Sequence, residues 1–132
     1  FQPESSDLQS WMESPYEQNK KYPEQKIYGT SAGIHVRSKS ESMIVYLLHD
    51  YKIPFRYESE LELGQVTVYP DFTIRHPKTG KLFLWEHLGM VDEPAYRRNA
   101  LSKLQLYMEH GWIPSVNLIL TFETKEYPLC MA

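Results

Sequence analysis

Three acidic residues, Glu41, Asp71 and Glu86, stand at positions from which their side chains could act together on a metal ion. Asp71 follows Pro70 in a predicted strand, and Glu86 interrupts the otherwise apolar segment KLFLWEHL. A buried carboxylate without a partner is costly, so two carboxylates that face each other call for a cation. Carboxylate oxygens suit Mg²⁺ or Mn²⁺, and an ion bound this way activates water for attack on a phosphate ester.

Two predicted strands bring Asp71 and Glu86 together. The strands span residues 66–74 and 81–88, and the turn-forming residues HPKTG join them. Asp71 and Glu86 are therefore expected to lie opposite each other at the same level of a hairpin. Alternation along the second of these strands places Glu86 on one face with leucines on either side of it.

Glu41 lies in the first turn of a helix predicted over residues 38–51, for which Ser38 or Ser40 supplies the N-cap. The helix ends before Ile53-Pro54, because the residue before proline avoids the helical region. A strand is predicted over residues 55–63, followed by a tight turn at Gly64-Gln65. The apolar stripe of the helix consists of Met43, Ile44, Leu47, Leu48 and Tyr51.

The second half of the chain predicts a helix and a further strand. Asp92 is the expected cap of a helix over residues 93–110, and a buried strand is predicted over the apolar run VNLILTF. Pro70 indicates an edge or a bulge in its strand. The element order predicts an α/β fold, a mixed sheet flanked by helices. The expected apolar stripe of the second helix consists of Ala100, Leu101, Leu104 and Met108.

The composition is that of one globular domain. Hydrophobic residues make up 42% of the 132 residues, and 14 Lys and Arg stand against 17 Asp and Glu, a net charge of -3. That mild acidity argues against a bulk nucleic-acid binder. The single Cys130 forms no intrachain disulfide, and no long apolar run or leader is present, so a cytoplasmic protein without membrane contact is expected.

Residues 1–32 are interpreted as an N-terminal arm or linker and residues 33–132 as the folded domain. The arm is rich in Glu, Gln, Ser and Pro and offers little apolar surface to bury. Leu8, Trp11 and Met12 fall at helical spacing and predict one short amphipathic turn. The chain begins at Phe1 rather than Met, as a piece of a longer protein would.

The strings VRSKSE, YPDFTI, WEHLGM and NLILTFE carry a resemblance to a known family. With their order of elements, they resemble the core of the PD-(D/E)XK, or restriction-endonuclease-like, nuclease superfamily, and within it a bacterial subgroup of small nuclease-like domains. The resemblance covers roughly residues 33–122 and implies an α-β-β-β-α-β core. It also implies a magnesium-dependent endonuclease that hydrolyses phosphodiester bonds, with DNA favoured over RNA.

The resemblance implies a role for each acid. Asp71 would be the central metal ligand, and Glu86 the second ligand, with the backbone carbonyl of His87 beside it. Glu41 would bind a second ion directly or through water. Glu41 and Asp71 also have ordinary structural interpretations, since an acid in a helix's first turn is favoured by the helix dipole and Pro-Asp is a common turn device. Glu86 is the hardest to explain in that way, because the residues around it are apolar.

One position departs from the family pattern, because Leu88 stands where the family has a lysine. His87 is adjacent to Glu86, so its ring is expected on the opposite face, and reaching round as a ligand or base is the weaker hypothesis. The preferred substitute is Lys103, which shares one face of the second helix with Tyr96, Asn99 and Tyr107. Lys103 with Tyr107 is similar to the Gln-x-x-x-Tyr motif of some members, although a solvated helix face would look the same.

Arg37, Lys39 and Tyr107 are the predicted contacts to nucleic acid, with the two cations just before Glu41 placed to hold backbone phosphates. Two alternatives stay open. The domain could be a non-catalytic nucleic-acid-binding or assembly module, for which Leu88 in the lysine position is the best support. It could also act only when joined to a helicase or another DNA-processing domain of a longer chain.

Overall fold

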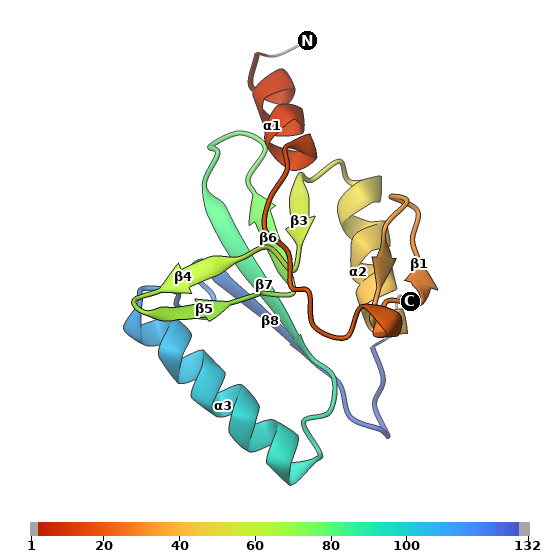
Figure 1. Ribbon diagram of the computed structural model, residues 1–132, viewed down its shortest axis with the longest axis vertical. Helices are drawn as coiled ribbons and strands as arrows, with labels where there is room; N and C mark the ends of the chain where they lie inside the picture. The colour runs from red at the N-terminus through yellow and green to blue at the C-terminus, as the bar shows by residue number, and fades with distance from the viewer. Residues whose placement is uncertain (1–2, 130–132) are drawn as a thin grey trace.

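The computed structural model describes residues 3–129, so Cys130 lies outside the described residues. The helical elements are α1 (Pro3–Glu13), the short 3-10 helix η1 (Pro23–Gln25), α2 (Lys39–Asp50) and α3 (Pro94–Glu109). The strands are β1 (Tyr28–Gly29), β2 (His35–Val36), β3 (Phe55–Tyr57), β4 (Leu61–Leu63), β5 (Val66–Val68), β6 (Phe72–Arg75), β7 (Leu82–Leu88) and β8 (Leu118–Phe122). Most of the strands lie between two helices of the chain, α2 and α3, and a further helix, α1, stands near the N-terminus (Figure 1).

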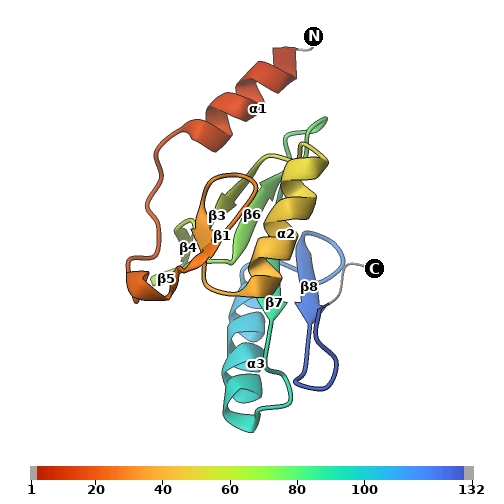
Figure 2. The ribbon, with the colours of Figure 1, turned by 90° about the vertical axis from the view of Figure 1, so that its right-hand side faces the viewer.

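A four-stranded sheet in the order β3-β6-β7-β8 forms the centre of the fold. β3 and β7 both run antiparallel to β6, whereas β7 and β8 are parallel. Figure 2 shows α2 and α3 beside this sheet, and the core residues place α2 on one face and α3 on the other. The predicted α/β class with a mixed sheet is confirmed.

Two predicted strands are each divided in the structure. The segment 55–63 breaks at Glu58, whose φ of 50° ends β3, and β4 follows. The segment 66–74 breaks at Pro70 and Asp71, since proline has no N–H to give to a neighbouring strand. β4 and β5 consequently form a separate hairpin, with the predicted turn at Gly64, whose φ is 64°.

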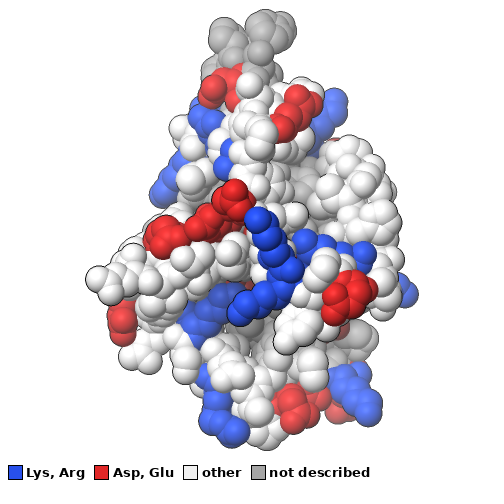
Figure 3. All heavy atoms as spheres, in the orientation of Figure 1, with Lys and Arg blue, Asp and Glu red and all other residues white. Residues whose placement is uncertain are grey.

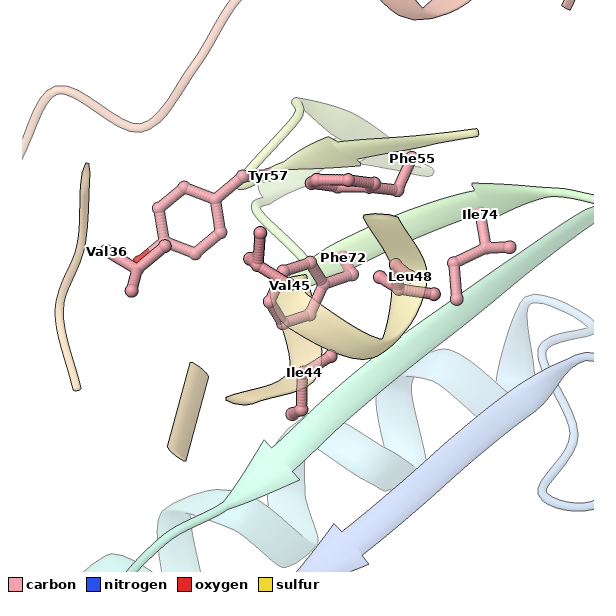
Figure 4. Packing of buried hydrophobic residues seen from close by; sticks show 8 residues of the cluster. All are labelled: Val36, Ile44, Val45, Leu48, Phe55, Tyr57, Phe72 and Ile74. Atoms are coloured by element: carbon pink, nitrogen blue, oxygen red, sulfur yellow. The ribbon is translucent and has the colours of Figure 1, made fainter. Parts of the chain in front are cut away.

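The helix α2 matches its prediction closely. Ser38 is the N-cap, and its hydroxyl oxygen accepts a hydrogen bond from the Glu41 backbone N–H at 3.1 Å. Tyr51 was predicted to join the apolar stripe but is 70% exposed, because the helix ends before it. Figure 4 shows the core that α2 helps to build, consisting of Val36, Ile44, Val45, Leu48, Phe55, Tyr57, Phe72 and Ile74.

The helix α3 presents a different face to the sheet from the one predicted. Leu101 is 60% exposed and Met108 is 43% exposed, whereas Tyr107 is fully buried. Glu93 rather than Asp92 is the N-cap residue, and the Asp92 carboxylate instead accepts from the Lys125 backbone N–H. The packed face therefore carries polar side chains, and the expected apolar stripe is wrong in part.

The strand β8 lies at one edge of the sheet and is not buried on both faces as predicted. Ile119 is 37% exposed and Phe122 is 56% exposed. It pairs with β7 along one side only, in spite of its continuous apolar sequence. A run of apolar residues predicts a strand but does not distinguish a central strand from an edge strand.

The N-terminal arm lies along the opposite edge of the sheet. Its helix α1 is longer than the single predicted turn, and Leu8 within it is buried. Gln18 forms a β-bridge with Ser59, and the Glu60 N–H donates to the Glu17 carbonyl at 2.8 Å. The arm thus covers the β3 side of the fold, and the predicted domain boundary at residue 32 stays a prediction.

Among the described residues, no helix is both long enough and apolar enough to cross a membrane.

Candidate active site

Asp71 and Glu86 lie opposite each other where β6 begins. The register pairs Phe72 with Trp85, so one further step along both strands pairs Asp71 with Glu86. Phe72 packs into the core on the α2 side, so alternation turns the Asp71 side chain toward α3. The Asp71 carboxylate also accepts a hydrogen bond from the His87 backbone N–H at 2.7 Å.

The helix α3 provides two partners for Glu86, which is only 3% exposed. The Tyr107 hydroxyl donates to its Oε1 at 2.6 Å, and the Lys103 ammonium lies 2.8 Å from the same oxygen. Tyr107 and Lys103 are four residues apart, so both point from one face of the helix. The carboxylate that was hardest to place in an apolar strand is therefore paired, and its partner is the predicted lysine.

The electrostatics of the site leave negative charge incompletely balanced. Burial raises the pKa of the Asp71 carboxyl well above its ordinary value, and the charges of Glu86 and Glu41 raise it further. Burial alone would lower the pKa of Lys103, but Glu86 and Asp71 outweigh that effect and raise it. A site in which one ammonium serves two close carboxylates has a place for additional positive charge.

Glu41 lies at the edge of this site within a hydrogen-bond network of its own. It is 8% exposed, and its Oε1 accepts from the Tyr57 hydroxyl at 2.7 Å and from the Arg37 backbone N–H at 3.0 Å. Burial raises its pKa. Its charge contributes to the raised pKa of Asp71, so the first turn of α2 belongs to the same electrostatic environment.

The His87 ring lies on the opposite side of β7 from Asp71 and Glu86. Nδ1 is 2.7 Å from the Thr121 hydroxyl, and Nε2 is 2.6 Å from the Glu123 carboxylate. The hypothesis that this ring reaches round to the acidic site is therefore corrected, because both ring nitrogens have partners on the other face. Glu123, which also accepts from Ser40, was missed by sequence reasoning although it directly follows the apolar run of β8.

The three predicted contacts to nucleic acid have different environments. Tyr107 is fully buried with its hydroxyl on Glu86, so its predicted contact with nucleic acid is wrong. The Arg37 guanidinium is held by Glu58 at 2.7 Å and by backbone carbonyls of the arm. Lys39 is exposed at the start of α2. For Arg37 and Lys39, contact with phosphate stays a prediction.

Tyr96 brings a further hydroxyl to the site. This hydroxyl accepts a hydrogen bond from the Gly89 backbone N–H at 2.9 Å, just beyond the end of β7. Burial raises its pKa, and the charges of Asp71 and Glu86 raise it further. Three of the four residues predicted to share a face of α3, namely Tyr96, Lys103 and Tyr107, thus contact β7 or the residue that follows it.

The donor set fits a hard divalent ion better than a metal that needs a complete protein cage. Within residues 3–129, no group of three or more His, Cys, Asp and Glu side chains is arranged to hold a metal. Mg²⁺ is commonly held by one or two carboxylates, and water and phosphate fill its remaining positions. Asp71 and Glu86 satisfy that requirement, and the raised pKa of Asp71 is consistent with a carboxylate that a cation would stabilise.

Comparison with known proteins gives a partial match. The chain is 33% identical over 92 residues to an uncharacterized protein of Methanocaldococcus jannaschii. The match covers 69% of this chain but only 8% of the length of that protein. No family model matches the sequence, and no solved structure matches it significantly.

Proposed function

We propose that this chain is a metal-dependent nuclease domain of the PD-(D/E)XK type that hydrolyses phosphodiester bonds, with DNA as its substrate. The observation that carries the proposal is the pairing of Asp71 with Glu86 across β6 and β7 beside the Lys103 ammonium. Two opposed carboxylates and a lysine resemble the PD-(D/E)XK constellation, and a metal ion held by such carboxylates can activate water for attack on a phosphate.

The element order supports the same proposal. Helix α2 carries Glu41, β6 and β7 carry the other two acids, and α3 and the parallel strand β8 complete an α-β-β-β-α-β core, with the β4-β5 hairpin as an insertion. Leu88 departs from the family pattern, but Lys103 brings an ammonium to Glu86 from a different element. The lysine of the constellation is then supplied by a helix rather than by the strand.

Each residue has a role in this proposal. Asp71 and Glu86 would hold Mg²⁺ or Mn²⁺, and the His87 carbonyl would join them. Extending the register places Pro70 opposite His87, and proline has no N–H to give to that carbonyl. The ion, when bound, would lower the pKa of a coordinated water and neutralise charge developing on the phosphate. Lys103 would orient the attacking water, and Tyr107 would hold the Glu86 carboxylate in place.

The test is cleavage of plasmid, linear duplex and single-stranded DNA by the purified chain with Mg²⁺ or Mn²⁺. We expect metal-dependent cutting that Asp71→Ala and Glu86→Ala each reduce by a factor of about 1,000 or more, because each removes a ligand of an ion worth several kcal/mol to the transition state. Lys78→Ala, an exposed change at the far end of the β6-β7 hairpin, is the control. Cutting by both acid variants at the native rate would show that the site assignment is wrong.

A second function is favoured by one observation. Leu88 occupies the family's lysine position and is 7% exposed, as a core residue would be. A non-catalytic nucleic-acid-binding module that has kept the fold would show this change. The match covers only 8% of a much longer protein, which is consistent with a module that works as one part of a longer chain. Calorimetry separates the two functions, since a binding module would bind nucleic acid without binding Mn²⁺.

A further inference from the structure

The arm exposes lysine and aromatic side chains close together in sequence. Tyr22 is 62% exposed and Tyr28 is 40% exposed, and Lys20 and Lys21 are exposed beside them. We call these four residues the arm patch. Figure 3 shows Lys and Arg side chains gathered across the middle of the face that the arm crosses in Figure 1.

A buried ion pair fastens the arm patch to the domain. The Arg37 guanidinium donates to the carbonyl of Tyr22 at 2.7 Å and to the carbonyl of Lys21 at 2.5 Å. The same guanidinium makes two hydrogen bonds to the Glu58 carboxylate, at 2.7 and 3.2 Å. The position of the patch is thus fixed by the residue that sequence reasoning assigned to phosphate binding.

The same residues connect the arm patch to the candidate active site. The Arg37 backbone N–H donates to the Glu41 carboxylate at 3.0 Å. The Glu58 backbone N–H donates to the Asp71 carbonyl at 3.0 Å. Hydrogen bonds made by Arg37 therefore link the patch to Glu41. A longer chain of hydrogen bonds, through Arg37 and Glu58, links the patch to Asp71.

Tyr22 has a backbone conformation that a bulky side chain rarely adopts. Its φ is 50° and its ψ is 54°, in the left-handed region. Such strain persists only where surrounding contacts impose it, and it clusters at binding and catalytic sites. The Tyr22 ring, being mostly exposed, gains little packing in return. The hydrogen bonds from Arg37 hold this backbone conformation and leave the Tyr22 ring exposed to solvent.

We propose that the arm patch binds a single-stranded segment of the nucleic-acid substrate and leads it to the candidate active site, an inference that rests on the proposed function. Tyr22 and Tyr28 would stack on unpaired bases, and Lys20 and Lys21 would contact backbone phosphates. Aromatic stacking needs bases that are free of a partner strand, which is why the patch fits a single strand rather than a duplex. The Glu17–Lys20 contact of 3.7 Å does not occupy Lys20, because both side chains are highly exposed.

Fluorescence anisotropy with labelled oligo(dT) and a matched duplex tests this proposal on the full chain, in EDTA and separately in Ca²⁺. Tyr22→Ala is expected to weaken oligo(dT) binding about fivefold or more, and Tyr22→Phe is expected to retain it. Lys20→Glu with Lys21→Glu is expected to weaken binding and to reduce its salt dependence. Duplex binding should change less in each case.

Tyr22→Gly separates binding from folding. Glycine adopts a positive φ without strain, so this variant should unfold at the same temperature as the native chain or at a higher one, while its oligo(dT) binding weakens. The matched controls are Tyr51→Ala, which removes another exposed tyrosine, and the double change Lys78→Glu with Lys81→Glu at the far turn. The proposal is overturned by undetectable oligo(dT) binding, by native binding in the patch variants, or by equal losses in the controls.

Cleavage assays distinguish this inference from the proposed function. Absence of metal-dependent cutting, together with oligo(dT) binding that depends on Tyr22, would reject the proposed nuclease function and support single-strand binding by the arm patch. Normal cutting of single-stranded substrates by the Tyr22→Ala and double lysine variants would reject the patch and keep the nuclease.

Discussion

The carboxylates of Asp71 and Glu86 are placed at the same level of two neighbouring strands, and one ammonium, that of Lys103, serves both. The Lys103 side chain is 37% exposed, whereas Glu86 is almost completely buried. Two close carboxylates with one ammonium beside them suit a divalent ion. Without that ion, the repulsion between the carboxylates lowers the stability of the folded chain. Residues at functional sites commonly sacrifice stability in this way.

Asp71→Asn is expected to stabilise the metal-free chain. A carboxyl with a raised pKa in the folded state binds its proton more tightly there than in the unfolded state, so ionisation destabilises the fold as pH rises. At pH 7 the asparagine variant should gain about 1 kcal/mol in unfolding free energy. The gain should shrink as pH falls toward about 4, near the ordinary aspartate pKa. Urea denaturation at both pH values checks this, and lower stability at pH 7 would contradict it.

Lys103→Met is expected to reduce both activity and stability. Loss of the ammonium should lower the cleavage rate by a factor of about 100 or more, the usual effect of removing a transition-state charge partner. Because the pKa of Lys103 is raised, its stabilising pairing with Glu86 is complete below pH of about 10.4 and is lost only at higher pH. The unfolding temperature of Lys103→Met should therefore be below that of the native chain throughout the neutral pH range. Lys103→Arg should restore part of that stability.

At the scale of elements, the site depends on how α3 and the arm pack against the sheet. The α3 face toward β7 carries Tyr96, Lys103 and Tyr107, while the leucine at position 101 points outward. Apolar periodicity favoured the other face, because it counts residue types and ignores hydrogen bonds to a buried carboxylate. The arm was interpreted as a linker for a similar reason, since its contacts to β3 are largely polar.

Arg37→Met is expected to release the arm from the domain. It removes one partner of a largely buried ion pair, with side-chain exposures of 17% and 6%, and leaves the Glu58 carboxylate with only Lys26, 3.7 Å away. The cost should be about 2 kcal/mol of unfolding free energy, because hydrogen bonds to a charged group are lost. Limited proteolysis should then cut faster between residues 14 and 30. Lys20→Met is the control, because it removes only the exposed Glu17–Lys20 pair. It should change neither the unfolding free energy nor the rate of proteolysis appreciably.

At the scale of the whole molecule, a net charge of -3 opposes binding to a polyanion. That total includes the three acids of the candidate site. Each divalent ion held there would add two positive charges where a phosphate docks. Mild acidity is therefore compatible with a phosphodiesterase that binds its substrate with a metal.

Divalent ions are expected to strengthen DNA binding by the native chain. Ca²⁺ binds oxygen ligands and adds two positive charges, so it should tighten the dissociation constant for DNA about tenfold or more relative to EDTA. The combined variant Asp71→Asn with Glu86→Gln should lose this response, because it has lost both proposed ligands. Anisotropy measured at one fixed ionic strength checks the prediction, and an equal response in that variant would place the metal effect elsewhere.

The sequence by itself determined the class of fold and the neighbours Asp71 and Glu86, because strand alternation and hairpin register are local properties of the chain. It also indicated Lys103, from helical spacing together with the lysine that the family resemblance led us to expect. Only the tertiary structure decided that the His87 ring faces Glu123, that Tyr107 is buried on Glu86, that β8 is an edge strand and that Arg37 anchors the arm. These outcomes depend on contacts between segments far apart in sequence, which local patterns do not encode.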